Sequence, residues 1–200
     1  YWSDEKSFFD EISQSNEFPN TIFHNAFDAA LGIPPRGIDG SKFPPINKEL
    51  SKTFLQCESQ AIRMMDTLDL DAAVSVAKKK HVYYKYLRYW HGILSELRPD
   101  AILFGDIPHS AYQWVVYSVA KKLGIKTVMY DSVKRIPDRL IFFEDCSSYE
   151  ELARAYTDIK KDIALEDLSS DLREYYNNQA DPRVDSSPVF LKKNYIEKAT

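Results

Sequence analysis

The stretch RPDAILFGDIPHSAYQWVVYSVAKKLGIKTVMY, residues 98–130, decides the fold. Near its start, Ala101–Gly105 is a short apolar run behind a helix-ending Arg-Pro-Asp, as expected for a buried parallel strand. At its end, Lys126–Tyr130 is a second run of the same kind. The residues between the two runs are too many for a hairpin and suit a crossover helix. The stretch therefore predicts a strand–helix–strand unit.

The connecting helix carries its own start and stop signals. Ser110 and Gln113 have the spacing of a capping box, which predicts a helix that begins at Ala111. Gly124 supplies the stop, and two lysines in the last turn suit the helix dipole. The apolar positions that recur at helical spacing are Tyr112, Val115, Val116, Val119 and Leu123.

Downstream of this unit the pattern continues. Leu140–Phe143 is predicted as a third strand of the sheet. Ser148–Glu151 has the form of a second capping box, which opens a helix to about Lys161. A last helix is predicted over Ser170–Asn178.

Upstream, Thr21–His24 is interpreted as a strand that comes after a short helix over Asp4–Ile12. Prolines and glycines between residues 34 and 45 predict a long loop, and the next helices are predicted over Lys48–Met65 and Asp71–Leu97. The predicted fold class is α/β: a Rossmann-like open parallel sheet with helices on both faces and a helix-rich insert between the first and central strands.

The composition limits what the chain can bind. Its 26 Lys and Arg against 30 Asp and Glu give a net charge of −4, so no basic footprint predicts a nucleic-acid partner. No apolar run approaches the ~18 residues of a membrane helix. Two cysteines, Cys57 and Cys146, are too few for a disulfide framework, and no glycine-rich nucleotide loop is present. The chain is expected to be cytoplasmic.

The domain organisation is expected to be one α/β domain over residues 1–180 and a linker over residues 181–200. The segment Asp181–Pro188 is rich in turn residues, and Val189–Thr200 is mostly polar. The chain begins at Tyr1 without a Met. We therefore expect it to be a piece of a longer protein that continues after the linker.

In an open parallel sheet, ligands bind beyond the carboxyl ends of the strands. The first such end leads through Asp106 and His109 to Ser110, directly before a helix N-terminus that favours anionic groups. An imidazole is the side chain most easily tuned to exchange a proton near neutral pH. His109 and Asp106 are therefore the catalytic candidates, and Ser110 is a candidate substrate-binding residue. The alternative is that His109 only shapes the turn and Ser110 only caps the helix.

Two further strand ends supply candidate substrate-binding residues. Tyr130, Asp131, Lys134 and Arg135 mix acidic and basic groups, which suits a polar or phosphate-bearing ligand, although surface ion pairs explain them equally well. His24 and Asp28 lie after the predicted Thr21 strand and reach the same cleft only if that strand joins the sheet.

A metal site is not predicted. Asp69-Leu70-Asp71 matches a metal-binding D-x-D pattern, but no strand precedes it, and Asp71 is better explained as an acid near a helix N-terminus. The four histidines are dispersed and lack H-x-x-x-H spacing.

The central stretch has a family resemblance over about residues 83–145. The residues that carry it are Tyr86, Tyr89-Trp90, Leu94, Arg98-Pro99-Asp100, Ile107-Pro108-His109, Val116–Lys121 and Gly124–Thr127. This succession resembles bacterial glycosyltransferases of capsular or surface polysaccharide biosynthesis, which have the two-domain GT-B architecture. Phe23-His24, Asp28-Ala29 and Gly32 add weakly to the likeness.

The resemblance implies that the chain is the N-terminal, acceptor-side domain of such an enzyme. A carbohydrate acceptor would bind at the strand ends, and His109 or Asp106 would act as the base on its hydroxyl. The nucleotide-sugar donor would be held by a C-terminal domain, so no cofactor is expected in this chain. The resemblance is compatible with peripheral association of the protein with the inner face of the membrane.

Two alternatives stay open at this point. One is a non-catalytic α/β module that binds a small anionic ligand. The other is a scaffold whose aromatic surface contacts a partner protein, because the chain contains 13 Tyr, 11 Phe and 3 Trp.

Overall fold

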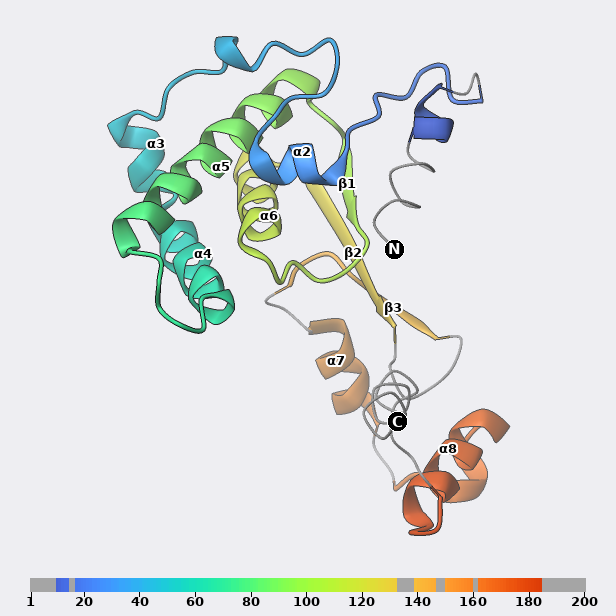
Figure 1. Ribbon diagram of the computed structural model, residues 1–200. Helices are drawn as coiled ribbons and strands as arrows, with labels where there is room; N and C mark the ends of the chain where they lie inside the picture. The colour runs from blue at the N-terminus through green and yellow to red at the C-terminus, as the bar shows by residue number, and fades with distance from the viewer. Residues whose placement is uncertain (1–9, 15–16, 133–138, 147–149, 160–161, 185–200) are drawn as a thin grey trace, which may run out of the picture. The chain divides into compact units, whose positions relative to one another are not determined.

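The computed structural model describes residues 10–14, 17–132, 139–146, 150–159 and 162–184. It is a mixed α/β structure with one small open sheet (Figure 1). Its helices are α2 (Ala26–Leu31), α3 (Lys48–Thr53), α4 (Leu55–Leu68), α5 (Val76–Leu97), α6 (Ala111–Leu123), α7 (Glu150–Asp158) and α8 (Ser170–Ala180). The strands are β1 (Ala101–Phe104), β2 (Lys126–Ser132) and β3 (Leu140–Phe143), and the 3-10 helices are η1 (Gly40–Lys42) and η2 (Leu165–Asp167).

The chain divides into two compact units. The first unit comprises Tyr1–Ile102 and Pro108–Thr127, and the second comprises Leu103–Ile107 and Val128–Thr200. The predicted boundary near Asp181 comes directly after α8, which ends at Ala180, and residues 185–200 lie outside the described chain.

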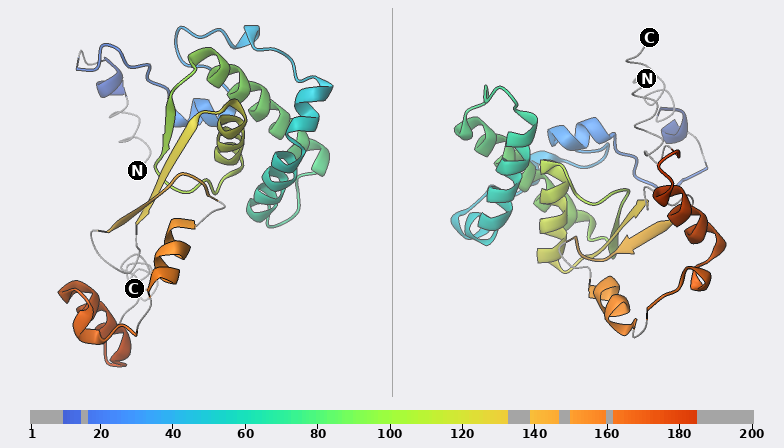
Figure 2. Two further views of the ribbon diagram at one scale, coloured as in Figure 1. Left: turned by 180° about the vertical axis from the view of Figure 1, so that it is seen from behind. Right: turned by 90° about the horizontal axis from the view of Figure 1, so that it is seen from below.

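The core of the first unit is a layer of three helices. α5 packs against α6 and α4, and α4 also packs against α6 (Figure 2). The predicted helical periodicity explains this packing, since the apolar positions share a face of each helix. The largest fully buried side chains in this layer are Tyr83, Leu87, Val115 and Val119.

Helix α6 has the predicted limits. The Gln113 side-chain oxygen accepts a hydrogen bond from the Ser110 amide at 3.2 Å, which is one half of the predicted capping box. Gly124 ends the helix in the left-handed conformation at φ 72°, which glycine adopts without the steric penalty of a Cβ. The predicted unit of β1, α6 and β2 is confirmed.

The prediction of an all-parallel sheet is wrong. β1 pairs with β2, and the Lys126 amide, at the start of β2, donates to the Asp100 carbonyl, just before β1. β3 pairs with β2 antiparallel, with Met129 opposite Phe143 and Ser132 opposite Leu140. The physical reason is the short connection, because a parallel return needs a crossover of about a dozen residues or more. Among the described residues the sheet is therefore mixed and has three strands, which is a smaller sheet than the Rossmann-like one predicted.

The prediction that helices lie on both faces of the sheet stays a prediction. Among the described residues, part of the sheet surface is exposed to solvent. Three apolar side chains of β1 and β3 are largely exposed: Leu103 at 67%, Leu140 at 57% and Phe142 at 60%. Leu140 and Phe142 are two residues apart and lie on one face of β3, because side chains alternate along a strand. That face of β3 is not covered by the described residues.

The N-terminal strand prediction is also wrong. Thr21–His24 forms no strand, and Asn25 instead caps α2 by accepting from the Phe27 amide at 2.8 Å. With that strand absent, the helix-rich segment precedes the sheet and is not an insert within it. Of the predicted helix over Asp4–Ile12, residues 10–14 are helical and residues 1–9 lie outside the described chain.

Three helix limits differ from the predictions. The segment Lys48–Met65 contains two helices, α3 and α4, which meet at Phe54, a buried residue. Helix α5 begins at Val76 because Ser75 is its cap, and its hydroxyl accepts from the Lys78 amide. Helix α7 begins at Glu150 and ends at Asp158, while the predicted cap Ser148 lies outside the described residues.

Candidate functional site

The first candidate lies at the N-terminus of α6, in the first unit. The Gln113 side-chain oxygen accepts from the His109 amide at 3.3 Å and from the Ser110 hydroxyl at 2.8 Å. These bonds fix the turn, so Ser110 serves as part of the cap. His109 is exposed in this turn. An exposed imidazole on a fixed backbone next to a helix N-terminus can exchange protons with a bound hydroxyl.

The second unit holds Asp106, Tyr130 and Asp131. One Asp106 carboxylate oxygen accepts from the Ile107 amide at 2.7 Å and so supports the turn after β1. The Tyr130 hydroxyl lies 3.5 Å from the position that a Cβ on Gly105 would take, and its ring packs 6.2 Å from that of Phe142. This unit therefore brings Tyr130 close to the backbone beside Asp106.

The predicted pairing of Asp106 with His109 stays a prediction, because the two residues belong to different units. Asp131 lies in β2 opposite Ile141 of β3. Lys134 and Arg135 lie outside the described residues. The substrate-binding roles of Asp131, Lys134 and Arg135 stay predictions.

His24 and Asp28 are brought together around Tyr89 of α5. A His24 ring nitrogen lies 2.8 Å from the Ile33 carbonyl, and the Tyr89 hydroxyl lies 3.2 Å from the same ring. Burial, and secondarily the Asp28 carboxylate, raises the pKa of Tyr89 to about 12, so this hydroxyl keeps its proton at neutral pH. The contacts of His24 thus connect the segment around α2 to α5.

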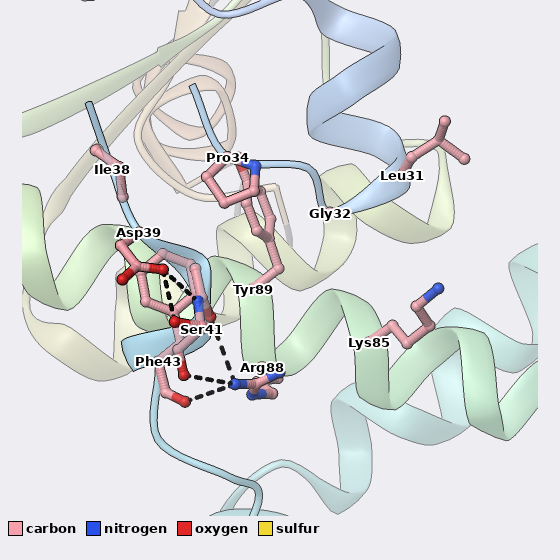
Figure 3. Close-up of a pocket in the computed structure, with 11 residues that line it drawn as sticks. Leu31, Gly32, Pro34, Ile38, Asp39, Ser41, Phe43, Lys85, Arg88 and Tyr89 are labelled. Atoms are coloured by element: carbon pink, nitrogen blue, oxygen red, sulfur yellow. Dashed lines mark hydrogen bonds between the residues drawn. The ribbon is translucent and has the colours of Figure 1, made fainter. Parts of the chain in front are cut away.

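Beside this cluster the first unit has an open pocket of about 320 Å³, between the segment 31–43 and α5 (Figure 3). Its polar side chains come from Asp39 and Ser41 on one side and from Lys85 and Arg88 on the other. Leu31, Pro34 and Ile38 supply apolar surface. The pocket therefore combines charged, hydroxyl and apolar groups, as small-molecule sites do.

Arg88 fixes the polar side of this pocket. Its guanidinium donates to the Phe43 carbonyl at 2.8 Å and to the Gly40 and Ser41 carbonyls, each at 3.4 Å (Figure 3). These carbonyls belong to η1 and the residue after it. The guanidinium thereby holds a segment that has little secondary structure of its own.

Phe43 fixes the same segment by packing. Its ring lies directly over Gly92, where an added Cβ would stand 2.3 Å from a ring carbon. Phe43 is buried, although the segment around it is exposed. Gly92 therefore leaves space on α5 for the Phe43 ring, which anchors the loop to the helix.

Asp39 has a defined charge state in the pocket. Its carboxylate accepts from the Ser41 hydroxyl at 2.6 Å and from the Ser41 amide at 3.0 Å. These hydrogen bonds hold the pKa of Asp39 below its ordinary value. The carboxylate is ionised at neutral pH and can accept further hydrogen bonds.

The Asp69-Leu70-Asp71 pattern is accounted for by an ion cluster. The Lys79 ammonium lies 2.7 Å from a carboxylate oxygen of Asp66 and 2.7 Å from one of Asp69. Lys79 is buried, so the charge of Asp69 neutralises a cation inside the protein. Asp69 therefore has a structural role here.

Sequence reasoning misses the pocket residues Asp39, Lys85 and Arg88. The proline- and glycine-rich stretch between residues 34 and 45 predicts only a loop, and Arg88 belongs to no recognised motif. One signal is present: Phe43 is the aromatic residue of the stretch 34–45, and Gly92 interrupts a helix of bulky residues. Such a pair is consistent with close packing of a loop on a helix.

Comparison with known proteins identifies no relative: no family model matches the chain, and neither the curated proteins nor the solved structures include a match. Within the described residues, every helix is too short or too polar to cross a lipid bilayer.

Proposed function

We propose that the chain is the acceptor-side half of a glycosyltransferase of GT-B architecture that acts in bacterial surface polysaccharide synthesis. The observation that carries the proposal is the unit of β1, α6 and β2, with His109 exposed directly before Ser110, the N-cap of α6. This is also the stretch in which the sequence resembles that family. The donor, a nucleotide sugar, would be held by a second domain.

In this proposal His109 is the base. A sugar hydroxyl is a poor nucleophile while it keeps its proton, so the imidazole removes that proton as the new glycosidic bond forms to the donor sugar. The nucleoside diphosphate or monophosphate leaves with the electron pair of the broken bond. A positioned base contributes about 10²–10⁴ to the rate. Asp106, Tyr130, Asp131, Lys134 and Arg135 are proposed to contact the acceptor.

The test uses the natural full-length protein with a panel of nucleotide sugars and a glycan acceptor extract. His109→Ala is expected to lower turnover by about 10²–10⁴ without changing the thermal unfolding midpoint. His81→Ala is the matched control, because His81 is also exposed but lies on α5. Turnover by His109→Ala near that of the wild type would exclude the proposed base, and an equal loss in both variants would show a non-specific effect.

A further inference from the structure

We propose that the pocket between the segment 31–43 and α5 binds a small organic anion of monosaccharide size, namely a sugar acid or a sugar phosphate. This inference goes beyond the proposed function and does not depend on it. The pocket contains none of the residues that we propose for glycosyl transfer.

The walls of the pocket are fixed before any ligand arrives. The Arg88 hydrogen bonds and the packing of Phe43 on Gly92 hold residues 40–43. The contacts of His24 with Tyr89 and Ile33 hold the other end of the segment. A ligand therefore does not have to order the loop, which lowers the entropic cost of binding.

The charge of the pocket favours an anion. Lys85 and Arg88 are three positions apart on α5 and so lie on one face of that helix. Within the part of the chain that the structure describes, the exposed Lys85 ammonium forms no ion pair or hydrogen bond. Asp39 is the one carboxylate among the lining residues. Because Lys85 and Arg88 are positive and Asp39 is negative, the pocket has a net positive charge. The Lys85 ammonium can therefore bind an anionic group of a ligand.

The remaining groups favour a ligand with several hydroxyls. The Asp39 carboxylate can accept hydrogen bonds from sugar hydroxyls, while its negative charge disfavours a second anionic group at that end of the ligand. Leu31 and Pro34 offer apolar surface to the C–H groups of a ring. A volume of about 320 Å³ lies at the small end of ligand sites, which suits one sugar residue.

The experiment is isothermal titration of the full chain with three probes of one size: glucuronate, glucose 6-phosphate and glucose. We expect at least one of the two anions to bind, and glucose to bind at least tenfold more weakly. The two anions separate a carboxylate preference from a phosphate preference. Lys85→Gln is expected to weaken anion binding by about tenfold, the loss typical of one charge-assisted hydrogen bond.

Lys78→Gln is the matched control, because Lys78 is an exposed lysine of the same helix that does not line the pocket. It is expected to bind the anion like the wild type, and so is His109→Ala, which separates this test from that of glycosyl transfer. The proposal is overturned if neither anion binds, if glucose binds equally well, or if Lys85→Gln binds the anion as tightly as the wild type.

Discussion

The helical layer of the first unit and the strand β3 of the second are both rich in apolar residues, yet their burial differs. Leu87 of α5 is 0% exposed, whereas Phe142 of β3 is 60% exposed. In α5 the apolar residues recur with the period of the helix and meet two partner helices. In β3 the apolar residues are consecutive and point to both faces, so they need cover on two sides. Periodicity therefore indicates burial more directly than apolar content does.

The largest effect is expected from removing a buried side chain of the helical layer. Leu87→Ala is expected to lower the free energy of unfolding by about 2–5 kcal/mol, because it removes a fully buried side chain and leaves a cavity. Urea denaturation followed by circular dichroism measures this change. Leu140→Ala in β3 removes the same atoms from an exposed site and is expected to change the free energy by less than about 0.5 kcal/mol. Equal losses of unfolding free energy in the two variants would contradict the difference in burial between α5 and β3.

An intermediate effect is expected at Gly92. Gly92→Ala places a Cβ 2.3 Å from the Phe43 ring and is expected to destabilise the protein by about 1–3 kcal/mol, despite the better helix propensity of alanine. The thermal unfolding midpoint measures this change.

Gly105→Ala is the control from the second unit, since its Cβ would make an ordinary contact at 3.5 Å with the Tyr130 hydroxyl. We expect little change in its midpoint. If Gly92→Ala proved as stable as the wild type, the close packing of Phe43 on α5 would be contradicted.

The smallest effect is expected from the charge cluster of Lys79. The hydrogen bond from the Lys79 ammonium holds the pKa of Asp69 below its ordinary value. The ionised carboxylate therefore stabilises the fold above the unfolded-state pKa of about 4, and this contribution is lost as the pH falls through the lower folded-state value.

Asp69→Asn removes this acid-dependent contribution. The variant is expected to be less stable than the wild type at pH 7, with a difference that shrinks below about pH 4. Urea midpoints measured between pH 7 and pH 3 test this expectation. Asp71→Asn is the control, because Asp71 is exposed and does not belong to the ion cluster. A constant difference at all pH values would argue against the ion pair.

The parts of the fold that the sequence predicts correctly are those with local signals. The limits of α6 depend on Ser110, Gln113 and Gly124, which act within one or two turns of the chain. The direction of β3 and the absence of a strand at Thr21–His24 depend on which segments pair across the sheet. Pairing is a non-local property, and an apolar run alone does not determine it.

The residues of the candidate site also differ in whether local sequence signals predict them. The position of His109 directly before α6 is predictable, because the capping residues around it fix its turn. The pocket is not, because Asp39 and Arg88 are far apart in the chain, and Arg88 holds the segment of Asp39 only through backbone carbonyls. Carbonyl groups occur at every residue, so no pattern of side chains marks the ones that Arg88 binds.

The hydrogen bond from Arg88 to the Phe43 carbonyl joins residues that are 45 positions apart. It closes a ring of chain that contains α3 and α4, in the manner of a non-covalent cross-link. Closing a ring of this length restricts the conformational entropy of the enclosed chain. Amide protons of α3 and α4 should therefore exchange with solvent together, in a cooperative opening that first releases Phe43 from α5.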